Sequence, residues 1–521
     1  MSPMGERHLG RLALSAFERQ GDRPALLFEG RWHTSGELIE RSRRLAGGLA
    51  SIGVGPGDRV VVTMANCPEV TIAYQAVWIA GAVVCPAVFL LPAGDLRHVV
   101  GDAQAAAVIT TPELAARVIE AVDGLDPAPA LLCTEPVDRR LQALSELEQE
   151  DPAPLAQRGD DDLAALLYTG GTTGRAKGVM LSHANLWFSG QAAHEVAYVP
   201  GVVRTLTALP LSHAYGILVT LAGMHVPEPT VNVLMRWFEP SQWLALIEEH
   251  RLQHTAVVPT MLQVLLAEPL EERDLSSLSW ISCGGAPLPQ EVERAFRERL
   301  PHVSVRQGYG LTETAALLTT NPTGAERPGS VGLPVPGVQL EIRDDAGRPV
   351  PRGEIGEVCA RSPGIMSGYW RSPEATAEAL DGGWLRTGDL GRLDEDGYLY
   401  IVDRRKDLII RGGFNVYPRD VEDALVRHPD VQMAGVVGRP SERHGEEVVA
   451  FVSARPGHRV DPPSLIEWAR EHIGGYRYPR EVHVLESIPL TPVGKVDRKA
   501  LRALLGGPGG AGSKRAATAG S

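Results

Sequence analysis

The sequence has few cysteines, no long apolar run and no excess of basic residues, and each deficit excludes a class of protein. Its five cysteines are an odd number, lie far apart and form no Cys-x-x-Cys pair, which argues against a disulfide framework and a zinc site. No uninterrupted apolar stretch is long enough to span a bilayer, and the residues after Met1 lack the apolar core of a signal peptide. The formal net charge of −13 argues against a nucleic-acid partner. Together these features predict a cytoplasmic enzyme-sized protein.

The chain of 521 residues is long enough to bury more than one hydrophobic core, so at least two domains are expected. Up to Ile119, helix-like and strand-like segments alternate, for example a buried strand at 59–64 and a helix at 69–80. Alternation of this kind predicts an α/β fold of helix-covered parallel sheets. Residues 128–159 are rich in Asp, Glu and Pro and are expected to form a surface excursion. Residues 327–400 contain short strands and turns, which predict a small barrel-like β subdomain.

A charged run, Asp403–Asp407, separates two apolar strand-like segments and has the composition of an exposed linker. The predicted architecture is therefore a large N-terminal domain, 1–403, of two helix-covered sheets and the β subdomain. A small, mobile α+β domain, 404–505, follows it. The Gly/Ala/Ser-rich tail, 506–521, is expected to be disordered.

The most informative stretch runs from Tyr168 to Val179 and reads Tyr-Thr-Gly-Gly-Thr-Thr-Gly-Arg-Ala-Lys-Gly-Val. Its glycines let the backbone turn tightly, and its threonine hydroxyls and Lys177 supply the donors and the cation that a polyphosphate needs. It is not a Walker loop, because Lys177 follows Ala176 and precedes Gly178. In isolation it could equally be a Gly/Thr-rich surface turn.

Two further stretches offer groups suited to a nucleotide. The glycines of Cys283–Leu288 would let a flat heterocycle lie directly on the backbone, and Tyr309 offers a ring to stack on it. Thr312 offers a hydroxyl for a phosphate, and Glu313 a carboxylate for magnesium, which needs only one or two carboxylates beside phosphate oxygens. The structural alternatives are a plain strand–helix connector and a Tyr-Gly turn.

Three single residues carry little information by themselves. His213 lies beside apolar residues, where a histidine is usually structural. Asp389 could be a turn residue, or it could accept hydrogen bonds from ribose hydroxyls as acidic residues do in dinucleotide sites. Lys495 lies on a loop bracketed by Pro and Gly, where a lysine is normally just solvated.

Taken together, these motifs resemble those of the adenylate-forming superfamily, which includes acyl- and aryl-CoA synthetases, peptide-synthetase adenylation domains and beetle luciferases. The resemblance extends from Leu9 to Leu505, with the motifs in the family's order. It implies that Mg·ATP and a small carboxylic acid react to give an acyl-adenylate, and that the thiol of CoA then attacks the adenylate after the C-terminal domain has turned. The residues it implies for binding ATP or CoA are Thr169, Gly170, Gly171, Thr172, Thr173, Gly174, Lys177, Gly284, Gly285, Ala286, Pro287, Gln307, Gly308, Tyr309, Gly310, Thr312, Asp389, Val402, Arg404, Lys406, Gly412 and Gly413.

The resemblance also implies individual roles. Lys495 would bridge the acyl carboxylate and the α-phosphate in the first step, and Lys406 would be the pivot of the domain rotation. The loop at Gly412 and Gly413 would then build the pantetheine tunnel. The residues assigned to catalysis are Lys495, Glu313, His213 (which would line the acyl pocket) and Thr173, and those assigned to the magnesium ion are Glu313 and Thr173.

Two positions of the phosphate loop depart from the family pattern. Gly170 stands where serine is usual, and Ala176 where proline is usual. Both changes bear on the first step, because one removes a hydroxyl and the other loosens the turn before Lys177. An enzyme that forms thioesters from a preformed adenylate but adenylates poorly is therefore a competing function.

The preferred function is an acyl-CoA synthetase that acts on an apolar monocarboxylic acid. No basic residue occurs in the expected pocket segments 213–229 and 283–288 apart from histidines, although His225 and Arg236 lie close enough to change this. Besides the adenylation-poor variant, three other functions compete with this preferred function. They are an adenylating enzyme that loads a carrier protein, a luciferase-like oxidase, and a nucleotide- or acid-binding relic without turnover. The run 411–418 is closer to CoA synthetases, and no carrier domain with its own serine motif follows it.

Overall fold

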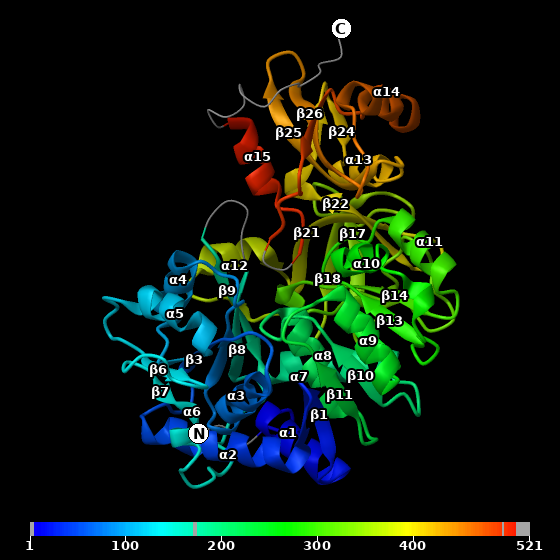
Figure 1. The fold of residues 1–521 in the computed structure, drawn as a ribbon. Helices are drawn as coiled ribbons and strands as arrows, with labels where there is room; N and C mark the ends of the chain where they lie inside the picture. Colours follow the sequence, from blue (N-terminus) through cyan, green and yellow to red (C-terminus); the bar gives the residue numbers. More distant parts are fainter. Residues whose placement is uncertain (1–4, 170–174, 492–493, 507–521) are drawn as a thin grey trace.

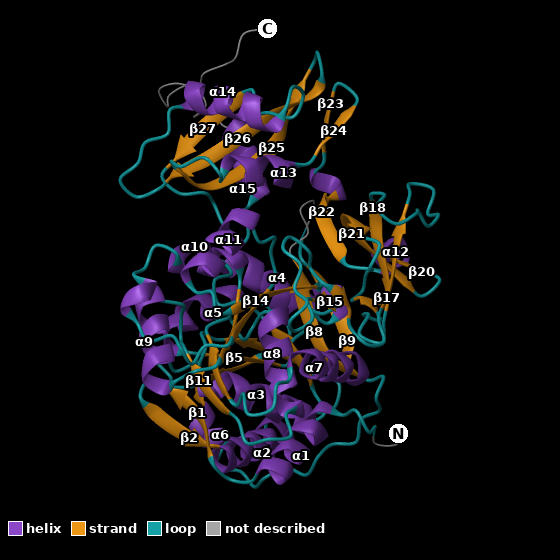
Figure 2. Ribbon diagram, turned by 90° about the vertical axis from the view of Figure 1, so that its right-hand side faces the viewer, coloured by secondary structure: helices purple, strands orange, loops and turns teal. Residues whose placement is uncertain are grey.

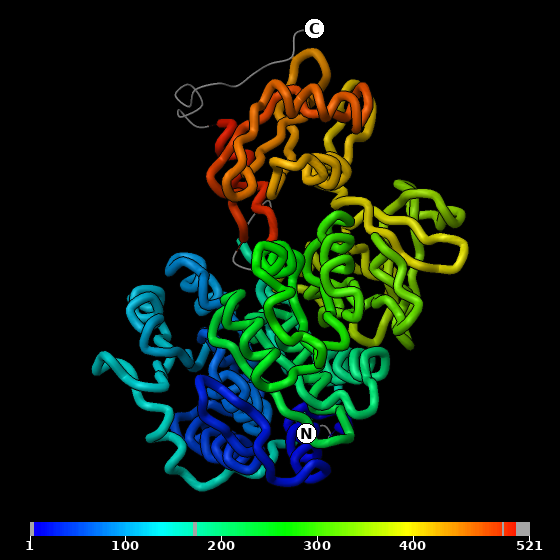
Figure 3. The backbone as a smooth tube through the Cα atoms, turned by 45° about the vertical axis from the view of Figure 1, so that its right-hand side comes forward, coloured from blue at the N-terminus to red at the C-terminus, as the bar shows by residue number. Residues whose placement is uncertain are grey.

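The computed structural model describes residues 5–169, 175–491 and 494–506, and these residues form four β-sheets with flanking helices. The N-terminal part of the chain forms the larger body, and the C-terminal segment, orange to red, sits above it in Figures 1 and 3. Part of the predicted phosphate loop (170–174) and the tail expected to be disordered, beyond Gly506, lie outside the described residues.

The first large sheet has eight strands in the order β19-β9-β8-β4-β3-β5-β6-β7. Strands β8, β4, β3, β5, β6 and β7 run parallel, whereas β9 is antiparallel to both β8 and β19. Apolar runs such as 60–62 suit strands that are buried on both faces. The strands are β3 (Arg59–Thr63), β4 (Val83–Pro86), β5 (Ala107–Thr110), β6 (Ala130–Cys133), β7 (Gln142–Ala143), β8 (Leu163–Thr169), β9 (Lys177–Ser182) and β19 (Gly368–Tyr369).

The second large sheet has nine strands in the order β16-β15-β14-β13-β12-β10-β11-β1-β2. Its central strands, from β14 to β1, run parallel, and antiparallel strands extend it at both edges. The strands are β1 (Pro24–Phe28), β2 (Arg31–Thr34), β10 (Arg204–Thr207), β11 (Val231–Leu234), β12 (His254–Val257), β13 (Trp280–Cys283), β14 (Ser304–Tyr309), β15 (Thr319–Thr320) and β16 (Leu333–Pro334).

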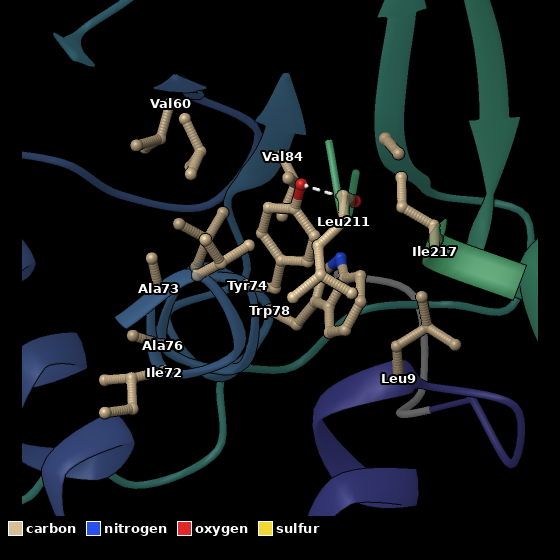
Figure 4. Close-up of a cluster of buried hydrophobic side chains, with 14 of the residues drawn as sticks. Leu9, Val60, Ile72, Ala73, Tyr74, Ala76, Trp78, Val84, Leu211 and Ile217 are labelled. Atoms are coloured by element: carbon tan, nitrogen blue, oxygen red, sulfur yellow. Dashed lines mark hydrogen bonds between the residues drawn. The ribbon is translucent and has the colours of Figure 1, made fainter. Parts of the chain in front are cut away.

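Helices cover both large sheets, and the largest hydrophobic core lies where the helices that cover the first sheet meet those that cover the second. Figure 4 shows this core, in which the Tyr74 hydroxyl donates a hydrogen bond to the Leu211 carbonyl oxygen over 3.1 Å. Trp78 Nε1 donates to the Ala164 carbonyl, so the polar atoms of both buried rings are paired. The helices are α1 (Leu9–Gln20), α2 (Ser35–Ser51), α3 (Pro68–Ile79), α4 (Ala93–Ala103), α5 (Ala115–Val122), α6 (Leu144–Leu147), α7 (His183–Ala197), α8 (Ala214–His225), α9 (Pro240–His250), α10 (Pro259–Leu265) and α11 (Gln290–Arg299).

Two smaller sheets complete the molecule. The first is antiparallel, runs β17-β18-β21-β20 with β22 paired to β21, and stands beside the large sheets in Figure 2. The second, in the C-terminal domain, runs β24-β23-β26-β25 with β27 paired to β26. The elements are β17 (Gln339–Arg343), β18 (Gly356–Arg361), α12 (Pro373–Ala379), β20 (Leu380–Asp381), β21 (Trp384–Leu393), β22 (Leu399–Arg404), β23 (Ile409–Arg411), β24 (Phe414–Val416), α13 (Pro418–Leu425), β25 (Val431–Ser441), β26 (Gly445–Ala454), α14 (Pro462–Ile473), β27 (Glu481–Leu485) and α15 (Arg498–Gly506).

The predicted α/β class, with two helix-covered sheets, a β subdomain and a small α+β domain, is confirmed. One expectation is wrong: residues 128–159 are not only a surface excursion, because β6 and β7 extend the eight-stranded sheet and α6 packs on α2. Burial of Leu132 and Cys133 stabilises a strand over the apolar run Ala130–Cys133, even though the residues around this run are polar. In the described part of the chain, no helix is both long and apolar enough to cross a membrane.

Candidate active site

A cavity of about 420 Å³ lies between one face of the nine-stranded sheet and helices α1, α7 and α8. Because side chains alternate along a strand, every second residue of β11, β12 and β13 lines the cavity. The opposite face packs into a separate hydrophobic core that contains Val233, Val257 and Ile281. Predicted site residues that line this one cavity are His213, Gly284, Gly285, Gly308, Tyr309, Gly310, Thr312 and Lys495.

The glycine turn after β13 forms a flat backbone floor at one end of the cavity. Gly285 has a φ of +82°, a conformation that residues with a Cβ rarely adopt. A Cβ at Gly284 would stand 3.5 Å from the Tyr215 ring, which is held in place by a 3.1 Å hydrogen bond from its hydroxyl to the Ser282 carbonyl. The turn therefore offers exposed peptide planes beside an aromatic ring, which suits a flat ligand.

His213 caps the N-terminus of α8 and is neutral. Its Nδ1 accepts a hydrogen bond from the Tyr215 backbone N–H over 3.3 Å, so the ring proton is on Nε2. Burial, together with the nearby Lys495 charge, lowers the His213 pKa to about 4. The side chain is therefore an N–H donor on the cavity wall that can orient a ligand oxygen.

Lys495 reaches the same cavity from a loop of the C-terminal domain. The Thr491 N–H donates to the Lys495 carbonyl over 2.7 Å, and the Lys495 N–H donates to Thr491 Oγ1 over 3.2 Å. The loop packs closely on α10, since a Cβ at Gly494 would lie 3.0 Å from Thr260 Oγ1. Burial, followed by the Arg404 charge, lowers the Lys495 pKa to about 8.

Glu313 lies on a 3-10 turn, η3 (Thr312–Thr314), and is held by an aromatic residue from a distant strand. The Tyr369 hydroxyl donates to Glu313 Oε1 over 2.9 Å, and the Lys177 ammonium lies 5.3 Å from the centroid of the Tyr369 ring. Tyr369 comes next to the phosphate loop because β19 pairs with β9. One tyrosine thus connects the lysine of the phosphate loop with the predicted metal ligand.

Asp389 connects Tyr309 with Arg404. Asp389 Oδ2 accepts a 2.8 Å hydrogen bond from the Tyr309 hydroxyl, and Oδ1 lies 3.2 Å from Arg404 Nε. The two charged residues face each other because they are register partners on β21 and β22. The Asp389 charge raises the pKa of Arg404, and burial followed by the same charge raises that of Tyr309.

The charged side chains around Lys495 fit a polyphosphate and its metal. Arg404, Lys406, Asp389 and Glu313 all act on the Lys495 charge, which makes a group of three cations and two carboxylates. Among the described residues, no group of three or more His, Cys, Asp or Glu side chains could hold a metal ion by itself. A magnesium ion bound mainly through phosphate oxygens needs only one carboxylate such as Glu313, so the donor set fits that ion.

The neighbours of Lys406 are anchored to different parts of the molecule. Arg405 pairs over 3.1 Å with Glu357 of β18, in the small antiparallel sheet, and over 2.7 Å with Asp345 in the turn after β17. Asp407 pairs over 2.7 Å with Arg502 of α15, in the C-terminal domain. The chain also changes from one sheet to the next here, between Arg404 and Ile409. The residues on either side of Lys406 are therefore held by different parts of the molecule.

Gly412 and Gly413 form the two-residue turn between β23 and β24. Their φ values are +58° and +83°, the pattern of a tight hairpin turn with both central residues left-handed. Neither glycine is among the described residues that line the cavity. The structure thus has Lys495 at the cavity and the glycine hairpin away from it.

The other predicted residues lie around the site or outside the described chain. Thr169 and Lys177 are register partners on β8 and β9, and His98 Nε2 lies 2.8 Å from the Ala176 carbonyl oxygen. Gln307 turns to the opposite face of β14, where its amide donates to Glu293 over 2.9 Å. Ala286, Pro287 and Val402 do not reach the cavity wall formed by the described residues. Gly170, Gly171, Thr172, Thr173 and Gly174 lie outside those residues.

The basic residues on the cavity wall differ from those suggested by the sequence. His225 packs on Trp187, and Arg236 pairs with Glu29 over 2.7 Å. Neither lines the cavity as the described residues form it, whereas Arg23 and Arg306 do. The sequence did contain a signal for Arg306, since a charged residue within a buried strand is uncommon.

Comparison with known proteins places this arrangement in a family. The model of the AMP-binding enzyme family matches residues 14–370, and that of the AMP-binding enzyme C-terminal domain matches residues 420–495. The chain therefore belongs to the AMP-binding enzyme family. Within that family, it is an AMP-forming acid–CoA ligase by class.

Relatives and solved structures support this class. The chain is 37% identical to a feruloyl-CoA synthase of Amycolatopsis sp, over 91% of this chain and 94% of the relative. It is 33% identical to a long-chain-fatty-acid–CoA ligase of Bacillus subtilis, over 96% and 95%. The amide bond synthetase McbA of Marinactinospora thermotolerans superposes with a TM-score of 0.85 at 35% identity, covering 95% of this chain and 99% of that one. ATP-bound MatB of Rhodopseudomonas palustris gives 0.86 at 30% identity, covering 95% and 98%.

Proposed function

We propose that the protein converts a largely apolar monocarboxylic acid, ATP and CoA into acyl-CoA, AMP and pyrophosphate through an acyl-adenylate. The observation that carries the proposal is the meeting of Lys495 with His213 and the Gly284–Gly285 turn around one cavity. A lysine delivered by a separate domain to a pocket with a flat backbone floor is suited to charge neutralisation between an acid and a nucleotide. A ligand-binding relic without turnover would not need a lysine placed in this way.

In the first step, a carboxylate oxygen of the acid attacks the α-phosphorus, and the bond to the pyrophosphate oxygen breaks. The protein contributes alignment and charge stabilisation, since phosphoryl-type transfer requires little covalent help from side chains. Lys495 would neutralise the acid and α-phosphate oxygens, with the Thr312 hydroxyl beside it. Lys177 would hold the departing pyrophosphate. Glu313, kept in place by Tyr369, would hold a magnesium ion, which supplies further neutralisation when bound.

In the second step, the CoA sulfur attacks the acyl carbon, the thiol loses its proton, and the bond to AMP breaks. Lys495 is no longer needed, and the hairpin at Gly412–Gly413 would replace it after a rotation about Lys406. The separate anchoring of Arg405 and Asp407 supports that pivot, because each half of the hinge moves with its own domain.

The acid is expected to have a largely apolar body, because the described cavity wall includes many apolar side chains from α1 and α8, among them Phe17, Leu218 and Ala222. The relatives' names agree with such bodies, since one is a feruloyl-CoA synthase and another a long-chain-fatty-acid–CoA ligase. The structural relative McbA is an amide bond synthetase, so an amine is the acceptor to compare with CoA.

The test is to incubate the protein with Mg·ATP and a panel of aromatic and aliphatic acids, and to follow adenylate and thioester separately by mass spectrometry. The panel is run with CoA, with a simple amine, and with no acceptor. Thioester from ATP, an acid and CoA is the expected result. Thioester only from a synthetic acyl-adenylate would instead establish the variant that lacks adenylation, and amide without thioester would contradict the assignment to CoA.

A further inference from the structure

The cavity wall is not uniformly apolar. The nine-stranded sheet presents a group of polar side chains to the cavity: Thr205, Thr207, Asn232, His254, Ser282 and Arg306. They share one face because Thr205 pairs with His254 and Ser282 with Arg306 in the parallel register. If this part of the cavity bound only the hydrocarbon body of a substrate, these polar side chains would lose their hydration without gaining hydrogen bonds in return.

Most of this group is satisfied internally. Asn232 Oδ1 accepts hydrogen bonds from the hydroxyls of Thr205 and Thr207, at 3.2 and 3.0 Å. His254 Nε2 lies 3.0 Å from Ser282 Oγ. Burial, followed by the Arg306 charge, lowers the His254 pKa to about 3, so this imidazole is neutral. His254, like the threonine, asparagine and serine side chains of the group, is therefore uncharged, and Arg306 is the cation among these six residues.

Arg306 differs, because two of its buried guanidinium nitrogens have no hydrogen-bond acceptor among the described residues. The residue is 7% exposed, and no described residue accepts a hydrogen bond from its Nε or Nη1. Its guanidinium carbon lies 4.6 Å from the Trp280 ring centroid. The nearest carboxylate oxygen, Glu326 Oε1, is 3.6 Å from Nε and already accepts hydrogen bonds from the Ser304 hydroxyl and the Gly324 N–H.

Arg23, the other arginine on the wall, makes the contrast clear. Its two Nη atoms donate to the Thr230 carbonyl and to the Gln20 side-chain oxygen, so that only its Nε lacks an acceptor among the described residues. A buried arginine cannot lose its charge, so unmet donors are costly unless a ligand or ordered water accepts from them. Arg306 lines the cavity that must hold the substrate and has unmet donor capacity beside it, although its Nε and Nη1 are themselves covered by neighbouring atoms.

The position of Arg306 fixes which end of the acid would meet it. It precedes Gly308 by two residues on β14, which is about 7 Å toward the amino end of the strand. Gly308, Tyr309 and Lys495 lie at the other end, where the carboxylate reacts in the proposed function. The body of the acid would therefore run along the sheet face, with its far end near Arg306.

We propose that Arg306 selects acids that carry a hydrogen-bond-accepting oxygen, a phenol oxygen or a second carboxylate, at the end remote from the reacting carboxylate. This inference rests on the proposed function and changes its substrate class at one point. The body of the acid remains largely apolar, but its distal end is polar, and an acid with a second carboxylate there is a dicarboxylate instead of the monocarboxylate proposed above. Arg306 is a specificity residue, since it lies away from the reacting atoms.

The test compares cinnamic acids that differ only at the para position: hydrogen, methyl, hydroxyl and carboxylate. The methyl and hydroxyl groups are nearly equal in size, so their ratio of kcat/KM reports the hydrogen bond, and the carboxylate separates an anionic from a neutral acceptor. The wild-type protein is expected to prefer at least one of the two oxygen-bearing acids over the methyl acid by about 10- to 100-fold, the range of a hydrogen bond to a charged group.

Arg306→Met should remove this preference or reverse it, and Arg306→Lys should keep part of it. Arg236→Met is the matched control, because Arg236 also pairs with a glutamate and packs on an aromatic ring but lies off the cavity wall. The ratio of kcat/KM for two acids, measured on one preparation, does not depend on the fraction of the protein that is folded. The wild-type ratio is in addition a test that does not require any variant to fold. Equal use of the methyl acid by the wild-type protein, or an unchanged ratio in Arg306→Met, would overturn the inference while leaving the ligase intact. No thioester from any acid would overturn both.

Discussion

Tyr369 donates a hydrogen bond from its hydroxyl to Glu313 Oε1 over 2.9 Å, and the same ring lies under the ammonium group of Lys177. The residue that would hold magnesium and the lysine that would hold pyrophosphate are thus positioned by one side chain. That side chain comes from the small strand β19, far along the chain from both of them.

We predict that Tyr369→Phe weakens the first step without affecting the second. Loss of one hydrogen bond to a charged carboxylate should reduce adenylation by about 10-fold or more, and the magnesium concentration needed for half-maximal rate should rise. ATP–pyrophosphate exchange over a magnesium titration measures both effects. Tyr398→Phe is the control, since its hydroxyl donates to the Ala325 carbonyl away from the cavity. An unchanged magnesium dependence would contradict the positioning role.

A second prediction concerns His98, which lies 2.8 Å from the carbonyl of Ala176 and packs edge-on against Tyr168. This contact ties the phosphate-loop backbone to α4 at the position where proline is usual in the family. His98→Ala should raise the KM for ATP by about 5- to 10-fold, the effect of one neutral hydrogen bond, with little change in thioester formation from a preformed adenylate. The control is His472→Ala, which removes the same kind of histidine–carbonyl contact, also 2.8 Å long, on α14.

A third prediction follows from the lowered pKa of Lys495, about 8. The ammonium form is the one that neutralises the reacting oxygens, so kcat/KM for adenylation should be full below pH 8 and fall as the pH rises through that value. Lys495→Arg should lose this decline, because guanidinium stays protonated throughout. Rate profiles of the first half-reaction from pH 6 to 10 check it. The same decline in Lys495→Arg would assign the titration to another group.

A fourth prediction concerns the hairpin turn before β24. Gly413→Ala places a side chain at a φ of +83°, with a local cost of about 1–2 kcal/mol, and adds bulk where pantetheine would pass. Thioester formation from a synthetic adenylate should fall about 10-fold, and adenylation should be unchanged. Gly457→Ala carries the same strain, at a φ of +78° in another open turn of the C-terminal domain, and should affect neither reaction. Equal losses in both half-reactions would contradict the assignment of the hairpin to the second step.

Much of this site could be predicted from the sequence, because its motifs are local. The glycine turn at Gly284–Gly285 and the Tyr309–Thr312 run were identifiable from neighbouring residues, whereas Lys495 was assigned only through the resemblance to the family. The structure gathers all three around one cavity. The strands and helices were predictable for the same reason, since their apolar periodicity is read within a short window.

The contacts that hold the motifs in place could not be predicted in this way. Tyr369 reaches Glu313 only through the antiparallel pairing of β19 with β9, and His98 reaches Ala176 from a separate helix. Arg306 lies within a strand that leads into a recognisable motif, yet its orientation depends on which face of β14 meets the cavity. A shift of one residue would turn Arg306 away from the cavity and Gln307 toward it, because side chains alternate along a strand.

The central claim is that one cavity serves two reactions with separable residues, and Lys495→Ala tests it most directly. Both half-reactions are measured on the same preparation: adenylate formed from acid and Mg·ATP, and thioester formed from a synthetic acyl-adenylate and CoA. The account predicts that adenylation falls by about 10²–10³-fold or more, the loss expected for a preorganised charge-stabilising donor, while thioester formation stays near the wild-type rate. Retained adenylation, or an equal loss of both reactions, would contradict it.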